Sequence, residues 1–188
     1  MSIQQKNKIV LSPIGEQDSE LLFAIGKAIE HVFTFSYQIV LLPELLESAL
    51  DPVRNQYHST QILKNLAHEA PPNAIKVIAI TNVDLFIPIL THVFGEAQLG
   101  GKACIVSTYR LGETSLNSTM DREAYMARTV KEAIHELGHT FNLRHCQNPN
   151  CIMHYCRSLR DVDRKGEGPC RYCKALLDSE LKKLASLK

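Results

Sequence analysis

Three features are scarce in this chain of 188 residues: net charge, long apolar runs and targeting segments. The formal net charge is +1 at pH 7, which argues against a general electrostatic attraction to nucleic acid or to anionic lipid. No stretch approaches the roughly eighteen continuous apolar residues of a transmembrane helix, so we expect no membrane association. The chain also contains no internal repeat and no low-complexity segment.

The N-terminal sequence MSIQQKNKIV lacks the apolar core of a secretory signal, so we expect a cytoplasmic protein. Because the cytosol keeps thiols reduced, the six cysteines are expected to be metal ligands or free thiols and not disulfides. The first strand is expected to begin by Lys8, which leaves few residues for an inhibitory segment over an active site.

Length and composition predict one compact, monomeric domain. Hydrophobic residues make up 45% of the chain and charged residues 22%, which is ordinary for a globular protein. A chain of this size buries about 70% of its unfolded surface, so a metal is not needed to hold the main fold. We expect residues 1–145 to form an N-terminal α/β subdomain and residues 146–188 to form a smaller C-terminal subdomain.

Alternating strand and helix patterns predict an α/β fold with a mixed, mostly parallel twisted sheet. Strands are expected at Lys8–Leu11, Gln38–Leu42, Ala74–Thr81, Val93–Ala97 and Lys102–Thr108, and helices at Glu16–Phe33, Asp121–Phe141 and Lys174–Leu187. A further helix should start with Ser59 or Thr60 as its N-cap and end at Pro71-Pro72. The second and third strands are expected to be buried. The turn at Gly100-Gly101 favours a hairpin, so the last two strands should be antiparallel.

The stretch HELGHTFNLRH, from His135 to His145, contains the strongest functional signal. His135 and His139 are four residues apart, so on a helix they share one face and can bind one Zn²⁺. His145 can be the third ligand only if the helix stops and the chain turns back. The stop should fall at Asn142, because asparagine tolerates the left-handed conformation of many helix ends. Three protein ligands leave a position open for water, as in catalytic zinc sites.

Four cysteines near this stretch have the spacing of a structural zinc site. They are separated by gaps of four, eighteen and two residues, and they are Cys146, Cys151, Cys170 and Cys173. Four thiolates complete a tetrahedral site, so Cys156 is left out of it. Cys104 lies in an apolar run and is expected to be a core residue. The chain is therefore expected to bind two Zn²⁺, one catalytic and one structural.

These motifs resemble the metzincin pattern H-E-x-x-H-x-x-G-x-x-H with a following Met-turn, except that Asn142 replaces the glycine. The added cysteines make the stretch from His135 to Cys173 similar to the archaemetzincins. The resemblance implies a zinc metallopeptidase that takes peptide or protein substrates. It also implies that Met153 is the Met-turn residue, a hydrophobic base beneath the zinc histidines.

Glu136 directly follows the first histidine and is expected to be the catalytic base that activates a zinc-bound water. In metzincins the antiparallel edge strand pairs with an extended substrate, and this role would fall to Val93, Phe94, Gly95, Glu96 and Ala97. The alternative is a strand that merely flanks the sheet. Tyr155 lies two residues after Met153, as does a tyrosine of the astacin-like and serralysin-like metzincins that stabilises the tetrahedral intermediate. The resemblance implies the same role for Tyr155. The alternative is a tyrosine that only packs against the Met-turn.

Two other functions remain open at this point. The first is a zinc-ribbon module that binds nucleic acid: the segment from Cys156 to Lys174 contains six basic and three acidic residues, a mild bias. The second is a zinc-containing peptide-binding protein with negligible turnover. The complete set of three histidines and a glutamate favours the peptidase, with no nucleic-acid partner expected.

Overall fold

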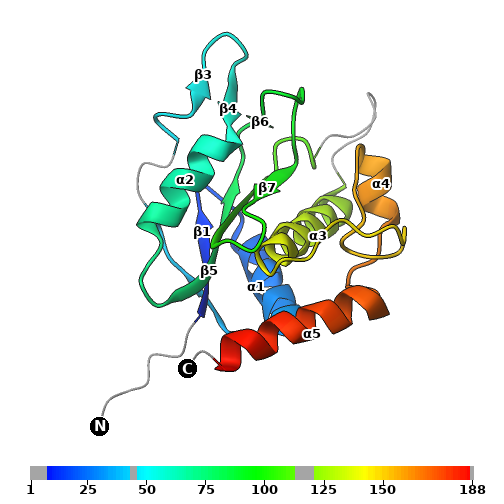
Figure 1. Ribbon diagram of the computed structural model, residues 1–188. Helices are drawn as coiled ribbons and strands as arrows, with labels where there is room; N and C mark the ends of the chain where they lie inside the picture. Colours follow the sequence, from blue (N-terminus) through cyan, green and yellow to red (C-terminus); the bar gives the residue numbers. More distant parts are fainter. Residues whose placement is uncertain (1–7, 43–45, 113–120, 187–188) are drawn as a thin grey trace.

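The computed structural model describes residues 8–42, 46–112 and 121–186. Its centre is a five-stranded sheet of order β2-β1-β5-β8-β7 (Figure 1). The strands are β1 (Lys8–Pro13), β2 (Tyr37–Ile39), β5 (Ala74–Thr81), β7 (Gly95–Ala97) and β8 (Ala103–Ser107). All neighbours pair in parallel except β7, which is antiparallel to β8. The predicted mixed, mostly parallel sheet with an antiparallel edge strand is confirmed.

Helices cover both faces of this sheet (Figure 1). Helices α1 (Ser19–Phe33) and α3 (Arg122–Thr140) pack on one face, and α2 (Ser59–Glu69) packs on the other. Successive strand residues point to opposite faces, so a strand covered on both sides must be apolar at consecutive positions. In β1, Ile9 and Leu11 face α1 and α3, whereas Val10 faces α2.

The start of α1 is three residues later than the predicted Glu16 because Asp18 caps the helix. The Asp18 carboxylate accepts a hydrogen bond from the Glu20 N–H at 2.9 Å, which satisfies one of the free donors of the first turn. The helix ends at Phe33, as predicted, and Thr34 follows with a left-handed φ of 63°.

The prediction of a buried strand at Gln38–Leu42 is wrong. The strand β2 is shorter, and Gln38 and Ile39 are exposed. The reason is its place at the edge of the sheet, where it pairs with β1 alone. Leu41, just beyond the strand, has 77% of its surface exposed. The prediction for Ala74–Thr81 is confirmed, since that strand lies between β1 and β8 and is largely buried.

The prediction of Ser59 or Thr60 as the N-cap of α2 is also wrong. The N-cap is His58, whose Nδ1 accepts a hydrogen bond from the Gln61 N–H at 3.3 Å. Both hydroxyls instead donate to the carboxylate of Glu96 in β7, the one from Thr60 at 2.8 Å. The N-terminus of α2 is thus tied to the edge strand.

Some short elements were not predicted. A small second sheet consists of β3 (Leu50–Asp51), β4 (Gln56–His58) and β6 (Leu85–Phe86), and a short helix, α4, spans Leu159–Arg164. The last helix, α5 (Arg171–Ser186), begins three residues before the predicted Lys174. Within the described ranges, no helix has the length and the apolar character needed to cross a bilayer.

Residues from both ends of the chain share one core. The buried cluster beneath α1 and α3 also contains Ile152, Met153 and Leu177 from the C-terminal part. Within it, the rings of Phe33 and Phe141 stack with their centroids 4.8 Å apart. The end of α3 is therefore packed against residues of α1 and against residues of the C-terminal part of the chain.

Candidate active site and metal centres

The end of α3 places the three histidines of the motif. The helix ends at Thr140, and Asn142 has a left-handed φ of 64°, so the predicted stop is confirmed. The Leu143 N–H then donates to the Gly138 carbonyl at 3.1 Å, a bond typical of helix ends with a left-handed residue. The chain reverses here and brings His145 against the helix.

The possible ligand atoms of His135, His139 and His145 all lie within 4.8 Å of one another. The Nε2 atoms of His135 and His139 are 3.1 Å apart. Two nitrogens bound tetrahedrally to one zinc at about 2.0–2.1 Å would be about 3.3 Å apart. The spacing of His135 and His139 therefore fits a shared zinc ion, and His145 lies close enough to be the third ligand.

Backbone carbonyls orient two of these imidazoles. The Nδ1–H of His135 donates to the Ile152 carbonyl at 2.8 Å, and the Nδ1–H of His139 donates to the Leu143 carbonyl at 2.7 Å. Because a carbonyl only accepts, the proton is on Nδ1 and the Nε2 lone pair is free for a metal. Burial lowers the pKa of His135 well below its ordinary value and lowers the pKa of His139 to about 4, so both rings are neutral at pH 7.

Met153 lies directly against the helix that carries the histidines. It is fully buried, and a Cβ atom added to Gly138 would lie 2.5 Å from its sulfur. Since real Cβ atoms do not approach so closely, only glycine at position 138 allows this packing. The structure thus places Met153 beneath the turn of α3 between His135 and His139.

Glu136 lies where α3 meets the edge strand. A Cβ atom added to Gly95 would be 2.7 Å from the Glu136 Cγ, so a side chain at position 95 would displace the carboxylate. Burial raises the pKa of Glu136 well above its ordinary value, and the nearby Glu132 carboxylate raises it further. A carboxyl placed beside a metal site in a cleft is the kind of group that acts as a general base.

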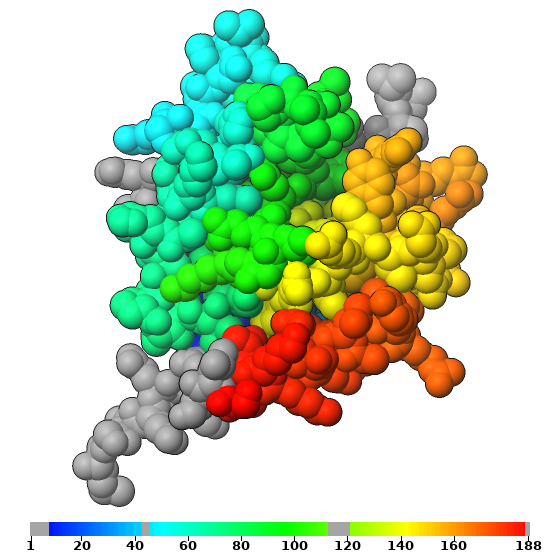
Figure 2. All heavy atoms as spheres, viewed as in Figure 1, coloured from blue at the N-terminus to red at the C-terminus, as the bar shows by residue number. Residues whose placement is uncertain are grey.

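A cleft of about 820 Å³ joins these groups. Its lining includes the three histidines, Glu136, Tyr155 and all five residues predicted for the edge strand, Val93, Phe94, Gly95, Glu96 and Ala97. Of these five, only Gly95–Ala97 belong to the regular strand β7. In Figure 2, the green segment that contains β7 crosses this face between α2 and the yellow segment that follows α3.

The cleft is also lined by residues that the sequence did not indicate, and those with charged or thiol side chains are Glu132, Arg144, Cys156 and Arg157. Glu132 is four residues before Glu136 in α3, and this helical spacing is the one signal that could have identified it. It is paired with the buried Lys165, whose Nζ lies 2.6 Å from a Glu132 carboxylate oxygen.

Tyr155 lies beside the third histidine. Its ring centroid is 4.9 Å from that of His145, it lines the cleft, and 43% of its surface is exposed. The guanidinium of Arg157 lies 5.7 Å from the centre of the Tyr155 ring. The phenol is therefore close to the histidine cluster, with room to move.

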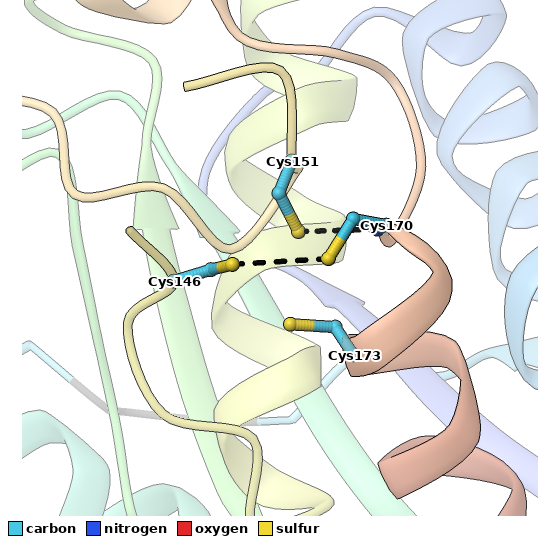
Figure 3. Close-up of side chains that lie close together, drawn as sticks. All are labelled: Cys146, Cys151, Cys170 and Cys173. Carbon is cyan, nitrogen blue, oxygen red and sulfur yellow. Dashed lines mark hydrogen bonds between the residues drawn. The ribbon is translucent and has the colours of Figure 1, made fainter. Parts of the chain in front are cut away.

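The four cysteine sulfurs point toward one another (Figure 3). They lie within 4.8 Å of one another, and those of Cys146 and Cys170 are 3.8 Å apart. Sulfurs bound tetrahedrally to one zinc at about 2.3 Å would be about 3.8 Å apart. A hydrogen bond from the Cys173 N–H lowers the pKa of Cys170 to about 7, whereas burial raises the pKa of Cys151 and of Cys173.

This cluster joins three segments of the chain. Cys146 directly follows His145, Cys151 lies in the Met-turn segment, and Cys173 lies in α5. The Cys146 N–H donates to the Met153 carbonyl at 2.8 Å. Cys104 is buried in β8, as predicted.

Comparisons with known proteins agree with this geometry. Residues 17–179 match the family model described as peptidase family M54. The archaemetzincin of Archaeoglobus fulgidus is 36% identical over 167 residues, which are 88% of this chain and 96% of that protein. The crystal structure of archaemetzincin from Methanopyrus kandleri superposes with a TM-score of 0.82 at 33% identity and covers 96% of this chain and 98% of that one.

A zinc-dependent peptidase from Methanocorpusculum labreanum has a TM-score of 0.79 at 30% identity, covering 90% of this chain and 99% of its own. The family match includes every strand of the main sheet except β1, together with the histidine motif and the cysteine cluster, and the relatives are matched over nearly their whole length. The chain belongs to peptidase family M54, the archaemetzincins, and is a zinc metallopeptidase of the metzincin type.

Proposed function

We propose that this enzyme hydrolyses peptide bonds in the cleft, with His135, His139 and His145 holding the catalytic zinc and Glu136 acting as the base. The zinc would lower the pKa of a water molecule and polarise the substrate carbonyl. The observation that carries the proposal is the convergence of three imidazoles beside a buried carboxyl in one cleft.

Glu136 moves the proton in this mechanism. Its carboxylate takes a proton from the attacking water and delivers it to the nitrogen of the leaving amine. The close approach of Gly95 holds the Glu136 side chain in the wall of the cleft. The Glu136 side chain is buried and lines the cleft, so a water molecule bound there can reach its carboxylate.

The edge strand is the proposed binding site for the substrate backbone. β7 is the last strand of the sheet and pairs with β8 alone, so an extended peptide can add along its other side. The bonds from Ser59 and Thr60 to Glu96 fix β7 from the face that α2 covers. This supports a binding role for Gly95–Ala97 over a strand that only flanks the sheet, whereas the Val93 N–H already donates to the Leu85 carbonyl at 2.9 Å.

Tyr155 is proposed to donate a hydrogen bond to the oxyanion that forms on the substrate. We expect Tyr155→Phe to lower the turnover number by about 10²-fold, since that is a typical cost of losing one oxyanion donor. Zinc content should not change, because the histidines are untouched. Steady-state kinetics beside metal analysis would measure both; an unchanged turnover number would leave Tyr155 with a packing role.

The four cysteines are proposed to hold a second, structural zinc that fixes the C-terminal subdomain, residues 146–188, to the segment carrying His145. Elemental analysis of protein purified without chelator should therefore find two zinc ions per chain. A reproducible value near one would refute one of the two sites.

The other functions have less support. A binding protein without turnover would not need a buried carboxyl beside the histidines, and the cysteine cluster is joined to the Met-turn segment and not displayed as a separate module. A cytoplasmic location, a monomeric state and the absence of a nucleic-acid partner stay predictions from the sequence.

A further inference from the structure

Two arginines line the cleft on segments that follow α3. Arg144 directly precedes His145, and Arg157 comes two residues after Tyr155. Both are exposed. Both guanidinium groups are therefore within two residues, along the chain, of a residue proposed to take part in the reaction.

The backbone at both arginines is held in place. The carbonyl of Leu143, the residue before Arg144, accepts a hydrogen bond from the Nδ1–H of His139 at 2.7 Å. The Arg157 N–H donates to the Asp161 carboxylate at 3.1 Å, which ties it to the capping box of α4. The backbone at both arginines is therefore fixed at the cleft. As a result, each guanidinium can contact only a limited part of a bound peptide.

Two of the three carboxylates that line the cleft already form an ion pair or hydrogen bonds within the protein. Glu132 is paired with Lys165 at 2.6 Å, and Glu96 accepts hydrogen bonds from Ser59 and Thr60. Glu136 is the proposed base. By contrast, neither Arg144 nor Arg157 forms an ion pair within residues 8–42, 46–112 and 121–186. The charge that remains available to a substrate is positive.

We propose that Arg144 and Arg157 select peptides with a glutamate or aspartate side chain close to the scissile bond. A planar guanidinium binds a carboxylate through two parallel N–H···O bonds, which favours an acidic side chain over its neutral amide. This inference rests on the proposed function, because it assigns the substrate class of the same cleft.

Binding to the zinc-loaded Glu136→Ala protein tests the inference without turnover. The probes are peptides blocked at both ends that carry one glutamate, moved through each position in turn, and matched peptides with glutamine there. We expect the glutamate peptide to bind about five- to tenfold more tightly at one or more positions, and the difference to shrink as salt is added. Equal affinity at every position would overturn the inference.

Arginine variants show which side chains cause the preference. In the Glu136→Ala background, Arg144→Gln and Arg157→Gln should each reduce the ratio of the two affinities, and the double variant should bring it near one. Arg160→Gln is the matched control, because Arg160 is exposed on α4 but does not line the cleft. A ratio that falls equally in Arg160→Gln would overturn the inference.

Cleavage by the wild-type enzyme separates this inference from the proposed function. If both peptides are cleaved with equal kcat/KM, the hydrolytic function stands and the acidic preference is refuted. If the glutamate peptide binds more tightly but neither peptide is cleaved, the preference stands and the hydrolytic function is refuted.

Discussion

Glu136→Ala should abolish most peptide cleavage while the protein keeps both zinc ions. The expected loss in kcat is about 10²- to 10⁴-fold, the usual contribution of a general acid–base group. The metal should remain because Glu136 is not among the histidines whose ligand atoms converge. Stability should change little or increase, since the substitution removes a carboxyl that burial disfavours in its charged form.

Glu123→Ala is the matched control for this variant. Glu123 lies in the first turn of the same helix but is exposed and outside the cleft. Turnover of peptide and zinc content should both stay near wild-type values. Cleavage at the wild-type rate by Glu136→Ala would show that the proposed mechanism is wrong.

Cys170→Ser should remove one zinc and lower the melting temperature by about 10 °C or more. Structural zinc sites contribute several kcal/mol to folding, and each kcal/mol shifts the melting temperature of a domain of this size by about 2–4 °C. The histidine site should still bind zinc, because two of its three ligands, His135 and His139, lie on α3 and are oriented by backbone carbonyls. Thermal melts together with zinc analysis measure both effects.

Cys156→Ser is the control for the cysteine prediction. Cys156 lies outside the four-sulfur cluster, and its thiol donates to the His154 carbonyl at 3.5 Å. This variant should keep two zinc ions and a wild-type melting temperature. If Cys170→Ser lost both metals, the two sites would not be separable as we propose.

The histidine geometry could be predicted because it depends on local rules. The spacing of four residues places His135 and His139 on one helical face, and Asn142 marks the left-handed end of the helix. The cysteine cluster follows from spacing in the same way, since the gaps between its members are typical of a closed zinc site.

Other features could not be predicted because they depend on contacts between distant segments. Serine is a common N-cap residue, but the Ser59 hydroxyl donates a hydrogen bond to Glu96 in β7. The N-cap of α2 is therefore His58. The apolar run of β2 looks buried in sequence, yet its place at the sheet edge leaves Ile39 exposed. The pairing of Lys165 with Glu132 likewise has no signature in either segment.

The central claim is that zinc and Glu136 together hydrolyse peptide bonds in this cleft. Its most direct test is digestion of a peptide library by the zinc-loaded protein, by the chelated protein and by the chelated protein after zinc is restored, with the products identified by mass spectrometry. We predict new peptide termini that disappear on chelation and return with zinc. No cleavage by fully zinc-loaded protein, or cleavage that persists after the metal is removed, would contradict the claim.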